Sequence, residues 1–250
     1  MLRALAIIPL VACTASSGDE GMLIVQNSAV GDKCEFTAAM PPFNPHGGLY
    51  LNSPQPYLLT PLVESRISAE MGQESQRTVA LHGARIDITI GAVEVIHEDG
   101  TVAALTFDAS ELATLKSTGV THFKSLFAAP LPPNMGTSNV AFDVVPLAML
   151  SSLRSKGALG AKDRMHAELI AKVVVFGDLG GDEVTSLPFE YPVTVCNDCI
   201  VSQPIPACPL PMATTVRTGN ACNLFQDGVV DCCTDPTTKA TVCPATVATM

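Results

Sequence analysis

Apolar and polar residues alternate with a period of two along several stretches of the chain, which is the pattern of a β-strand with one buried and one wet face. Within the segment 78–90, alanine and isoleucine at the even positions 84–90 alternate with arginine, aspartate and threonine at the odd positions 85–89. The segment 164–176 follows the same rule, and the pattern recurs in 184–196 after a glycine-rich acidic turn over 177–183. We therefore predict a strand over 78–90 and a long hairpin formed by 164–176 and 184–196.

Shorter apolar segments occur between clusters of glycine, proline and asparagine, which are typical of turns. The dipeptide Asp99-Gly100 separates two of these segments and is a common hairpin-turn signal. Pro61 lies inside a third segment and indicates an edge strand or a bulge. The pattern predicts further strands over 22–27, 33–38, 48–51, 57–66, 92–96, 101–107, 120–128 and 140–145.

Two short helices are predicted between the strands. Asp108 followed three residues later by Glu111 matches a capping box, so we expect a helix over 109–117 that stops at Gly119. Pro146 is compatible with a first helical turn and predicts a second helix that runs to residue 154. Many strands with few helices indicate an all-β fold, and we expect an immunoglobulin-like β-sandwich over residues 22–195.

The composition changes at residue 196. The segment 196–250 is rich in proline, threonine and cysteine, and it contains few long apolar runs. A segment of this kind cannot bury enough apolar surface to fold alone, and disulfides supply the missing constraint. We therefore predict a disulfide-rich C-terminal segment over 196–250.

The first thirteen residues contain a further motif. A basic residue, Arg3, precedes an apolar run, and the run ends in Leu-Val-Ala-Cys over 10–13. This arrangement resembles the signal peptide and lipobox of a bacterial lipoprotein. The resemblance implies that residues 1–12 are removed and that Cys13 carries a lipid with acyl chains such as palmitate. Residues 13–21 then form a flexible tether, and Thr14 after the cysteine implies retention in the outer membrane of the cell envelope.

The cysteine count agrees with an exported protein. The chain has nine cysteines, and eight remain when Cys13 is set aside for the lipid. An even number in an oxidising compartment predicts disulfides, although the pairing cannot be derived from the sequence. The candidates are Cys34, Cys196, Cys199, Cys208, Cys222, Cys232, Cys233 and Cys243. Adjacent Cys232 and Cys233 are expected to bond to two separate partners, because a bond between neighbours is strained.

The charge argues against one large class of partners. Fourteen basic residues against 24 acidic ones give a net charge of −10. Nucleic-acid binding depends on lysine and arginine at the phosphates, so we expect no nucleic-acid partner. The expected membrane contact is the lipid on Cys13 alone, and the sequence leaves open whether the other partner is a protein or a glycan.

Three groups of residues suggest chemistry of their own. Cys196 and Cys199 form a CxxC motif, which is compatible with a thiol–disulfide protein, but the prolines that follow argue against the helix such a motif uses. The acidic turn of Asp178, Asp182 and Glu183 is compatible with calcium and hence with a calcium-dependent adhesion module, as is the weaker set Asp227, Asp231 and Asp235, although the ligand spacing of an EF-hand is absent.

The remaining motifs point away from an enzyme. The five histidines, His46, His82, His97, His122 and His166, form no metal-binding or catalytic motif, and surface positions explain them. No nucleophile elbow, P-loop or dinucleotide fingerprint is present, although a hydrolase with a site assembled across the fold is not excluded. We therefore expect a lipid-anchored envelope protein with a binding or structural role, without catalysis, cofactor or metal.

Overall fold

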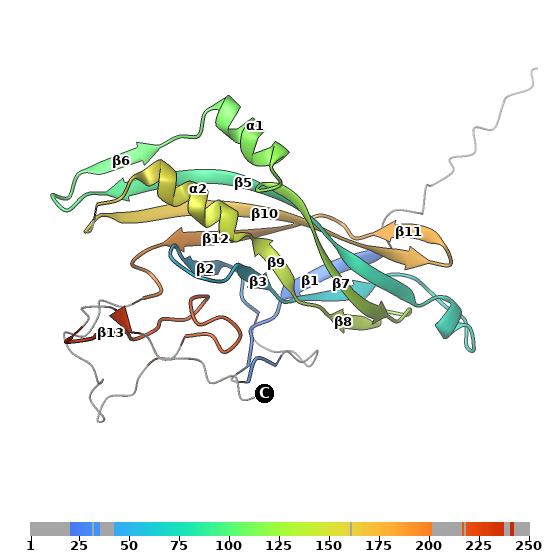
Figure 1. Cartoon of the computed structure of the whole chain (residues 1–250). Helices are drawn as coiled ribbons and strands as arrows, with labels where there is room; N and C mark the ends of the chain where they lie inside the picture. The colour runs from blue at the N-terminus through green and yellow to red at the C-terminus, as the bar shows by residue number, and fades with distance from the viewer. Residues whose placement is uncertain are drawn as a thin grey trace, which may run out of the picture.

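The computed structural model describes residues 21–31, 33–35, 43–160, 162–201, 217, 219–237 and 241–242 (Figure 1). A seven-stranded sheet and a three-stranded sheet form its body, together with two further strand pairs and two short helices. In the part of the chain so described, no helix is long and apolar enough to cross a membrane.

The seven-stranded sheet has the order β2-β12-β10-β5-β6, with β11 also paired to β10 and β7 also paired to β5. Its strands are β2 (Gly47–Tyr50), β5 (Val79–Ile96), β6 (Val102–Leu105), β7 (His122–Leu131), β10 (Arg164–Leu179), β11 (Asp182–Thr185) and β12 (Phe189–Cys196). The strand β2 runs parallel to β12, and every other pair is antiparallel. The long antiparallel pair of β5 and β10 is the centre of this sheet.

The predicted alternation decides which face of the large sheet is buried. On β10, all six apolar residues at alternating positions from Met165 to Val175 are fully buried, whereas residues between them are partly or well exposed. The buried face joins one hydrophobic core with Met149, Leu150 and Leu153 of the second helix. Burying one such leucine contributes about 1.5–3 kcal/mol, so this face largely fixes the register of the strands.

The smaller sheet and the strand pairs complete the core. The three-stranded sheet consists of β1 (Met22–Asn27), β4 (Pro61–Ser65) and β8 (Thr137–Asn139), in the order β1-β4-β8. The first strand pair is β3 (Tyr57–Leu59) with β9 (Phe142–Val145), and the second is β13 (Cys233–Thr234) with β14 (Thr241–Val242). A short 3₁₀ helix, η1 (Glu74–Gln76), precedes β5.

The two helices begin as the sequence predicts. Helix α1 (Ala109–Ser117) has a complete capping box, in which the Asp108 side chain accepts from the backbone of Glu111 and the Glu111 side chain accepts from the backbone of Asp108. The backbone N–H of Glu111 also lowers the pKa of Asp108. Helix α2 (Leu147–Gly157) has Pro146 as its N-cap and ends at Ala158, whose φ of 43° is left-handed.

Five of the predicted strand ranges are wrong. The predicted return strand 184–196 breaks at residues 186–188 into β11 and β12, which both pair with β10. Residues 33–35 form a turn, because Cys34 has a φ of 56°, and the rest of 33–38 lies outside the described residues. The predicted strand 57–66 breaks at Thr60 into β3 and β4, which pair with different strands. The predicted strands 78–90 and 92–96 are one strand, β5, because β10 pairs along its whole length. The all-β, sandwich-like fold with two short helices is confirmed.

Gly47, the first residue of β2, leaves no room for a side chain. A Cβ on Gly47 would lie 2.6 Å from the ring and hydroxyl of Tyr57, which is fully buried. Gly47→Ala is therefore expected to lower the free energy of unfolding by about 1–3 kcal/mol, which is the usual cost of overpacking a core. Urea unfolding measures this loss. Gly48→Ala is the control, because its Cβ would meet only the terminal carbon of Ile200 at 3.1 Å. Equal losses in both variants would contradict this explanation.

Candidate functional site

Six of the predicted cysteines are oxidised in the structure. Cys34 bonds to Cys222 across 188 residues, with 4.7 Å between the Cα atoms, and Cys196 bonds to Cys199. Two further cysteines, Cys232 and Cys233, are also disulfide-bonded. The two remaining disulfide candidates, Cys208 and Cys243, lie outside the described residues, as do Cys13 and the rest of the lipobox.

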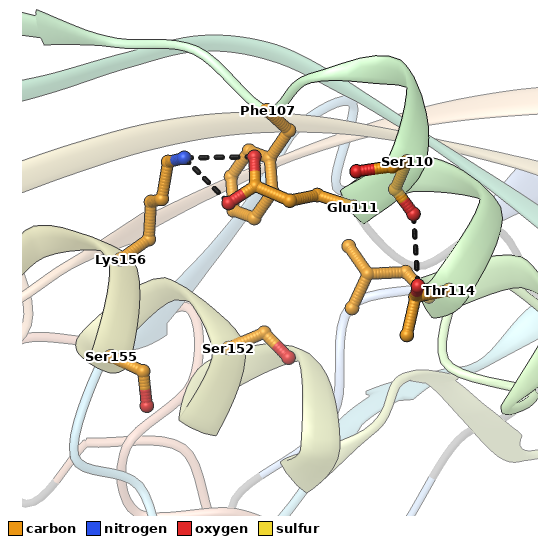
Figure 2. A pocket seen from close by; sticks show the side chains of 8 residues that line it. Phe107, Ser110, Glu111, Thr114, Ser152, Ser155 and Lys156 are labelled. Atoms are coloured by element: carbon orange, nitrogen blue, oxygen red, sulfur yellow. Dashed lines mark hydrogen bonds and ion pairs between the residues drawn. The ribbon is translucent and has the colours of Figure 1, made fainter.

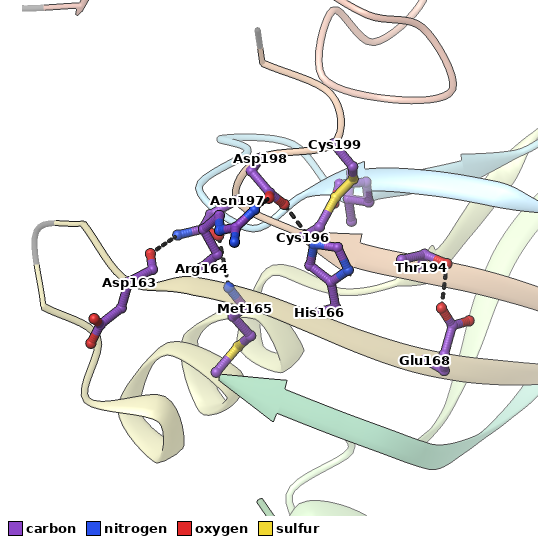
Figure 3. Close-up of polar contacts among 11 residues, drawn as sticks. Asp163, Arg164, Met165, His166, Glu168, Thr194, Cys196, Asn197, Asp198 and Cys199 are labelled. Atoms are coloured by element: carbon purple, nitrogen blue, oxygen red, sulfur yellow. Dashed lines mark hydrogen bonds and ion pairs between the residues drawn. A yellow bond between two sulfur atoms is a disulfide. The ribbon is translucent and has the colours of Figure 1, made fainter. Parts of the chain in front are cut away.

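The CxxC motif forms a disulfide at the end of β12 (Figure 3). The first cysteine, Cys196, is fully buried, whereas Cys199 is exposed. Residues 197–200 form bends, so in the part of the chain that the structure describes no helix begins at this motif to stabilise a thiolate. A redox CxxC needs an accessible first cysteine, whereas Cys196 is buried. The geometry favours a structural bond.

The residues between the two cysteines tie this loop to β10. The side chain of Asn197 accepts from the backbone N–H of Met165 at 2.8 Å and donates to the carbonyl of Asp163 at 2.9 Å. The Asp198 carboxylate lies 2.6 Å from Nε2 of His166, and Figure 3 shows these groups converging at the end of the strand. The side chains of Asn197 and Asp198 therefore hold the loop against the start of β10.

Each of the five histidines contacts one carboxylate. The pairs are His46–Glu168 at 3.6 Å, His82–Asp178 at 2.9 Å, His97–Asp163 at 3.1 Å, His122–Asp87 at 2.5 Å and His166–Asp198 at 2.6 Å. Within the described ranges, no group of three or more histidine, cysteine, aspartate or glutamate side chains could hold a metal ion. The histidines lie on the surface as predicted and make isolated pairs.

One of these pairs includes a hydroxyl and resembles part of a hydrolytic triad. Thr194 Oγ1 lies 3.0 Å from Nε2 of His46 and donates to Glu168 at 2.6 Å. In a working triad the hydroxyl proton goes to the imidazole, and the carboxylate contacts the other ring nitrogen. Here the hydroxyl donates directly to Glu168, and Glu168 also faces Nε2 of His46. This arrangement does not activate Thr194 as a nucleophile.

Two carboxylates of the acidic turn pair with basic side chains. Asp178 faces His82, and Glu183 accepts from Arg85 at 2.6 Å. Only Asp182 of the predicted calcium set has no basic partner among the contacts recorded for the described residues. Of the second set, Asp231 pairs with Arg217, while Asp227 has a different role, described next.

A buried chain of hydrogen bonds that the sequence did not reveal joins four segments. Asn27 Nδ2 donates to Tyr191 at 2.9 Å, the hydroxyls of Tyr191 and Tyr57 lie 2.9 Å apart, and Tyr57 lies 2.8 Å from a carboxylate oxygen of Asp227. An amide N–H can only donate and a carboxylate can only accept. Tyr191 therefore donates to Tyr57, and Tyr57 donates to Asp227.

Burial sets the acid–base properties of this network. It raises the pKa of Asp227, raises that of Tyr191 to about 12, and raises that of Tyr57 well above the ordinary value. Both tyrosines are essentially fully buried. A dissolved substrate cannot reach these hydroxyls, so the network is structural despite its resemblance to a catalytic cluster.

The network fastens the loop 223–227 to the sandwich, and we call this loop the anchor loop. The side-chain amide of Gln226 bonds both backbone groups of Leu58, accepting at 2.8 Å and donating at 2.7 Å. The backbone of the anchor loop also pairs with β2, since Tyr50 donates to Phe225 and Asp227 donates to Gly48. The C-terminal segment therefore continues the large sheet beyond β2.

A groove of about 380 Å³ lies between α1 and α2 (Figure 2). Lys156 crosses it and donates to both oxygens of Glu111, at 2.7 and 2.8 Å, and its ammonium lies 5.4 Å from the Phe107 ring centroid. The ammonium of Lys156 lowers the pKa of Glu111. Hydroxyls of Ser110, Thr114, Ser152 and Ser155 line the rest.

The described residues that line this groove form no catalytic arrangement. Thr114 and Ser152 donate their protons to helix carbonyls four residues back, so their oxygens remain free to accept. The groove therefore offers hydroxyl acceptors, the ion pair of Lys156 with Glu111 and the apolar surface of Leu115. That combination suits a small ligand with several hydroxyl donors. Comparison of the chain with protein-family models, curated proteins and solved structures finds no match.

Proposed function

We propose that this chain is an exported lipoprotein of the cell envelope, held in the outer membrane by a lipid on Cys13. Its β-sandwich has a binding or structural role and performs no catalysis. The groove between α1 and α2 is the surface that we propose for a small hydroxyl-bearing ligand.

The observation that carries this proposal is the disulfide between Cys34 and Cys222. Disulfides that join distant segments persist in oxidising compartments and are rare in the cytosol. The other bonded cysteines support the same compartment. Setting Cys13 aside leaves an even number of cysteines, which agrees with a lipid on Cys13 and oxidation of the rest.

The geometry gives less support to the two other functions that the sequence allows. A thiol–disulfide role for Cys196 and Cys199 would require attack on a bond whose first sulfur is buried. A calcium-dependent role would require carboxylates that are free to turn toward an ion, whereas Asp178 and Glu183 hold His82 and Arg85. A binding or structural role requires neither rearrangement.

The test of the anchor is Cys13→Ser in the full chain expressed in a bacterium with an outer membrane. We expect the unchanged chain to incorporate a labelled palmitate analogue and to partition into the detergent phase of a Triton X-114 extract. The variant should incorporate none, because a serine hydroxyl does not form the thioether. Thr14→Ala keeps the thiol and is the matched control.

Two results would overturn the proposed anchor. One is labelling of the Cys13→Ser variant at the level of the unchanged chain. The other is an intact mass showing an unmodified Cys13 in protein isolated from membranes. A protein with reduced Cys34 and Cys222 would remove the argument from the compartment, whatever the outcome at Cys13.

A further inference from the structure

The large sheet has four edge strands, namely β2, β11, β7 and β6. An open edge exposes unpaired backbone N–H and C=O groups and invites another strand to pair with it. Natural proteins protect such edges by covering them, by shortening them, or by placing charges and prolines on them. The four edges differ in which of these protections they have.

Three of the edges are protected. The anchor loop covers β2 through backbone bonds to Gly48 and Tyr50. The strand β11 is short and carries Asp182 and Glu183. The strand β7 carries His122 and Lys124 near one end and Pro130 near the other. Charge, proline or a covering segment therefore opposes strand addition at each of these edges.

The fourth edge, β6, is as short as β11, but it carries no charge and no proline, and in the described residues no strand or backbone-bonded loop covers it. It reads Val102-Ala103-Ala104-Leu105, with threonine on either side, and it contains no charge, proline or bulge. Val102 is 60 % exposed, and Ala104 is exposed as well. In the sheet order β6 is terminal, and in the described residues β5 is the strand that it pairs with.

The register shows which backbone groups face outward. His97 N donates to Thr101 O across the hairpin, so Thr101 turns its carbonyl toward β5. Antiparallel ladders alternate, so Ala103, opposite Val95, also directs its N–H and C=O toward β5. The N–H and C=O groups of Val102 and Ala104 then point to the open edge. Two donors and two acceptors lie within three residues.

We propose that β6 is the interface through which this chain pairs with a second copy of itself, edge to edge and antiparallel. A two-fold axis at Ala103 places Val102 of one copy opposite Ala104 of the other. This register forms four backbone hydrogen bonds and joins the two large sheets into one continuous sheet.

The chemistry of the strand fits a second copy. The Ala103 methyl groups meet at the axis, in a non-hydrogen-bonded pair where Cα atoms approach to about 4.5 Å and small side chains pack easily. No like charges face each other between Thr101 and Leu105, although the chain as a whole has a net charge of −10. The interface is short, so the dimer is weak and its population depends on concentration.

A pair of double variants tests the register. In Val102→Glu/Ala104→Glu, the proposed pairing sets glutamates directly opposite each other at both bonded positions, which is unfavourable. In Val102→Glu/Ala104→Lys, the same register sets glutamate opposite lysine. Both variants keep every backbone N–H and place their charges at exposed positions, so the fold of the chain is retained.

Sedimentation of the full chain, in a Cys13→Ser background that cannot carry the lipid, measures the outcome. We expect the weight-average mass of the parent to rise with concentration toward twice that of the monomer. The Glu/Glu variant should stay monomeric over the same range, and the Glu/Lys variant should dimerise again. Ala104→Pro, which removes one outward N–H per copy, should weaken the dimer about 30-fold, because each bond is worth about fivefold.

Three results would overturn the proposal. The parent chain could remain monomeric at every concentration, even if an unrelated extended peptide binds the edge. The Glu/Glu variant could dimerise as strongly as the parent. The Glu/Lys variant could stay monomeric although its circular dichroism and melting temperature match those of the parent.

Discussion

Replacing Cys34 and Cys222 together by alanine is expected to lower the free energy of unfolding by about 3–5 kcal/mol. The bond closes a loop across 188 residues, and in the chain-entropy account a longer loop constrains the unfolded chain more strongly. Changing both cysteines leaves no new free thiol, so the loss reports the crosslink itself. Urea unfolding under non-reducing conditions, followed by far-UV circular dichroism, measures it.

The matched control is the second disulfide. Cys196 and Cys199 are three residues apart, so their loop constrains the unfolded chain little. Replacing both by alanine is expected to cost about 1–2 kcal/mol from the crosslink. A loss as large as that of the long-range pair would contradict an entropic origin, as would an unchanged midpoint in the Cys34/Cys222 variant.

The sequence predicts those elements whose signals are local. The helix α1 matches its predicted range because a capping box, an N-cap and a stop are all encoded within twelve residues. The strand β1 matches its predicted range because the four apolar residues 22–25 at its start stand between small and polar segments. The inner face of β10 follows from period-two alternation alone. Each of these signals can be identified from the residues of the segment itself, whatever the segment packs against.

The errors occur where distant residues decide the conformation. The pattern over residues 33–38 predicts a strand. In the structure, the backbone of Cys34 is left-handed, and its sulfur is bonded to Cys222, which lies 188 positions away. The segment 57–66 reads as one strand, yet its two halves pair with β9 and with β1 and β8. No period or turn signal within a segment contains information about partners of that kind.

The hydrogen bonds of Asp227 are absent from the sequence pattern for the same reason. The spacing of Asp227 from Asp231 and Asp235 suggests only a weak calcium ligand. Its actual partner, Tyr57, lies 170 residues away, and Tyr191 enters from a third segment. The one local signal was Asp227-Gly228, a turn dipeptide. That signal predicts the bend but not the buried carboxylate.

Asp227→Ala is expected to lower the free energy of unfolding by about 3–4 kcal/mol. The change leaves the Tyr57 hydroxyl, the Gly48 N–H and the Gln226 amide without their acceptor, and each unsatisfied buried donor costs about 1–3 kcal/mol, partly relieved by water. Asp227 also has a φ of 56°, which alanine tolerates less well than aspartate. Urea unfolding measures the loss.

Asp227→Asn is the matched control, because asparagine keeps the shape of the side chain and tolerates the left-handed backbone. Its amide nitrogen cannot accept from Gln226 or Gly48, so we expect a loss smaller than that of alanine but still measurable. A stability equal to that of the unchanged chain would mean that the carboxylate carries no special role in the anchor loop.

The pH dependence distinguishes a buried carboxylate from a merely well-packed side chain. Burial raises the pKa of Asp227 above its unfolded value, so the folded state binds the proton more tightly. The stability from that proton is fully present below the unfolded pKa, near 3.9, and is lost as the pH rises through the folded pKa. Carboxylates whose pKa is lowered in the folded state, such as Asp108 and Asp163, change stability in the opposite direction.

The contributions of those other carboxylates cancel when the stabilities of the unchanged chain and of Asp227→Asn are compared at each pH, because both proteins contain them. The stability advantage of the unchanged chain is therefore expected to be largest near pH 3–4 and to shrink as the pH rises, provided that both proteins remain folded at the acid end. An advantage that grows with pH would mean that the donors around Asp227 outweigh its burial. In that case the carboxylate is ionised throughout, and the anchor loop is held by charge-assisted hydrogen bonds from Tyr57, Gly48 and Gln226.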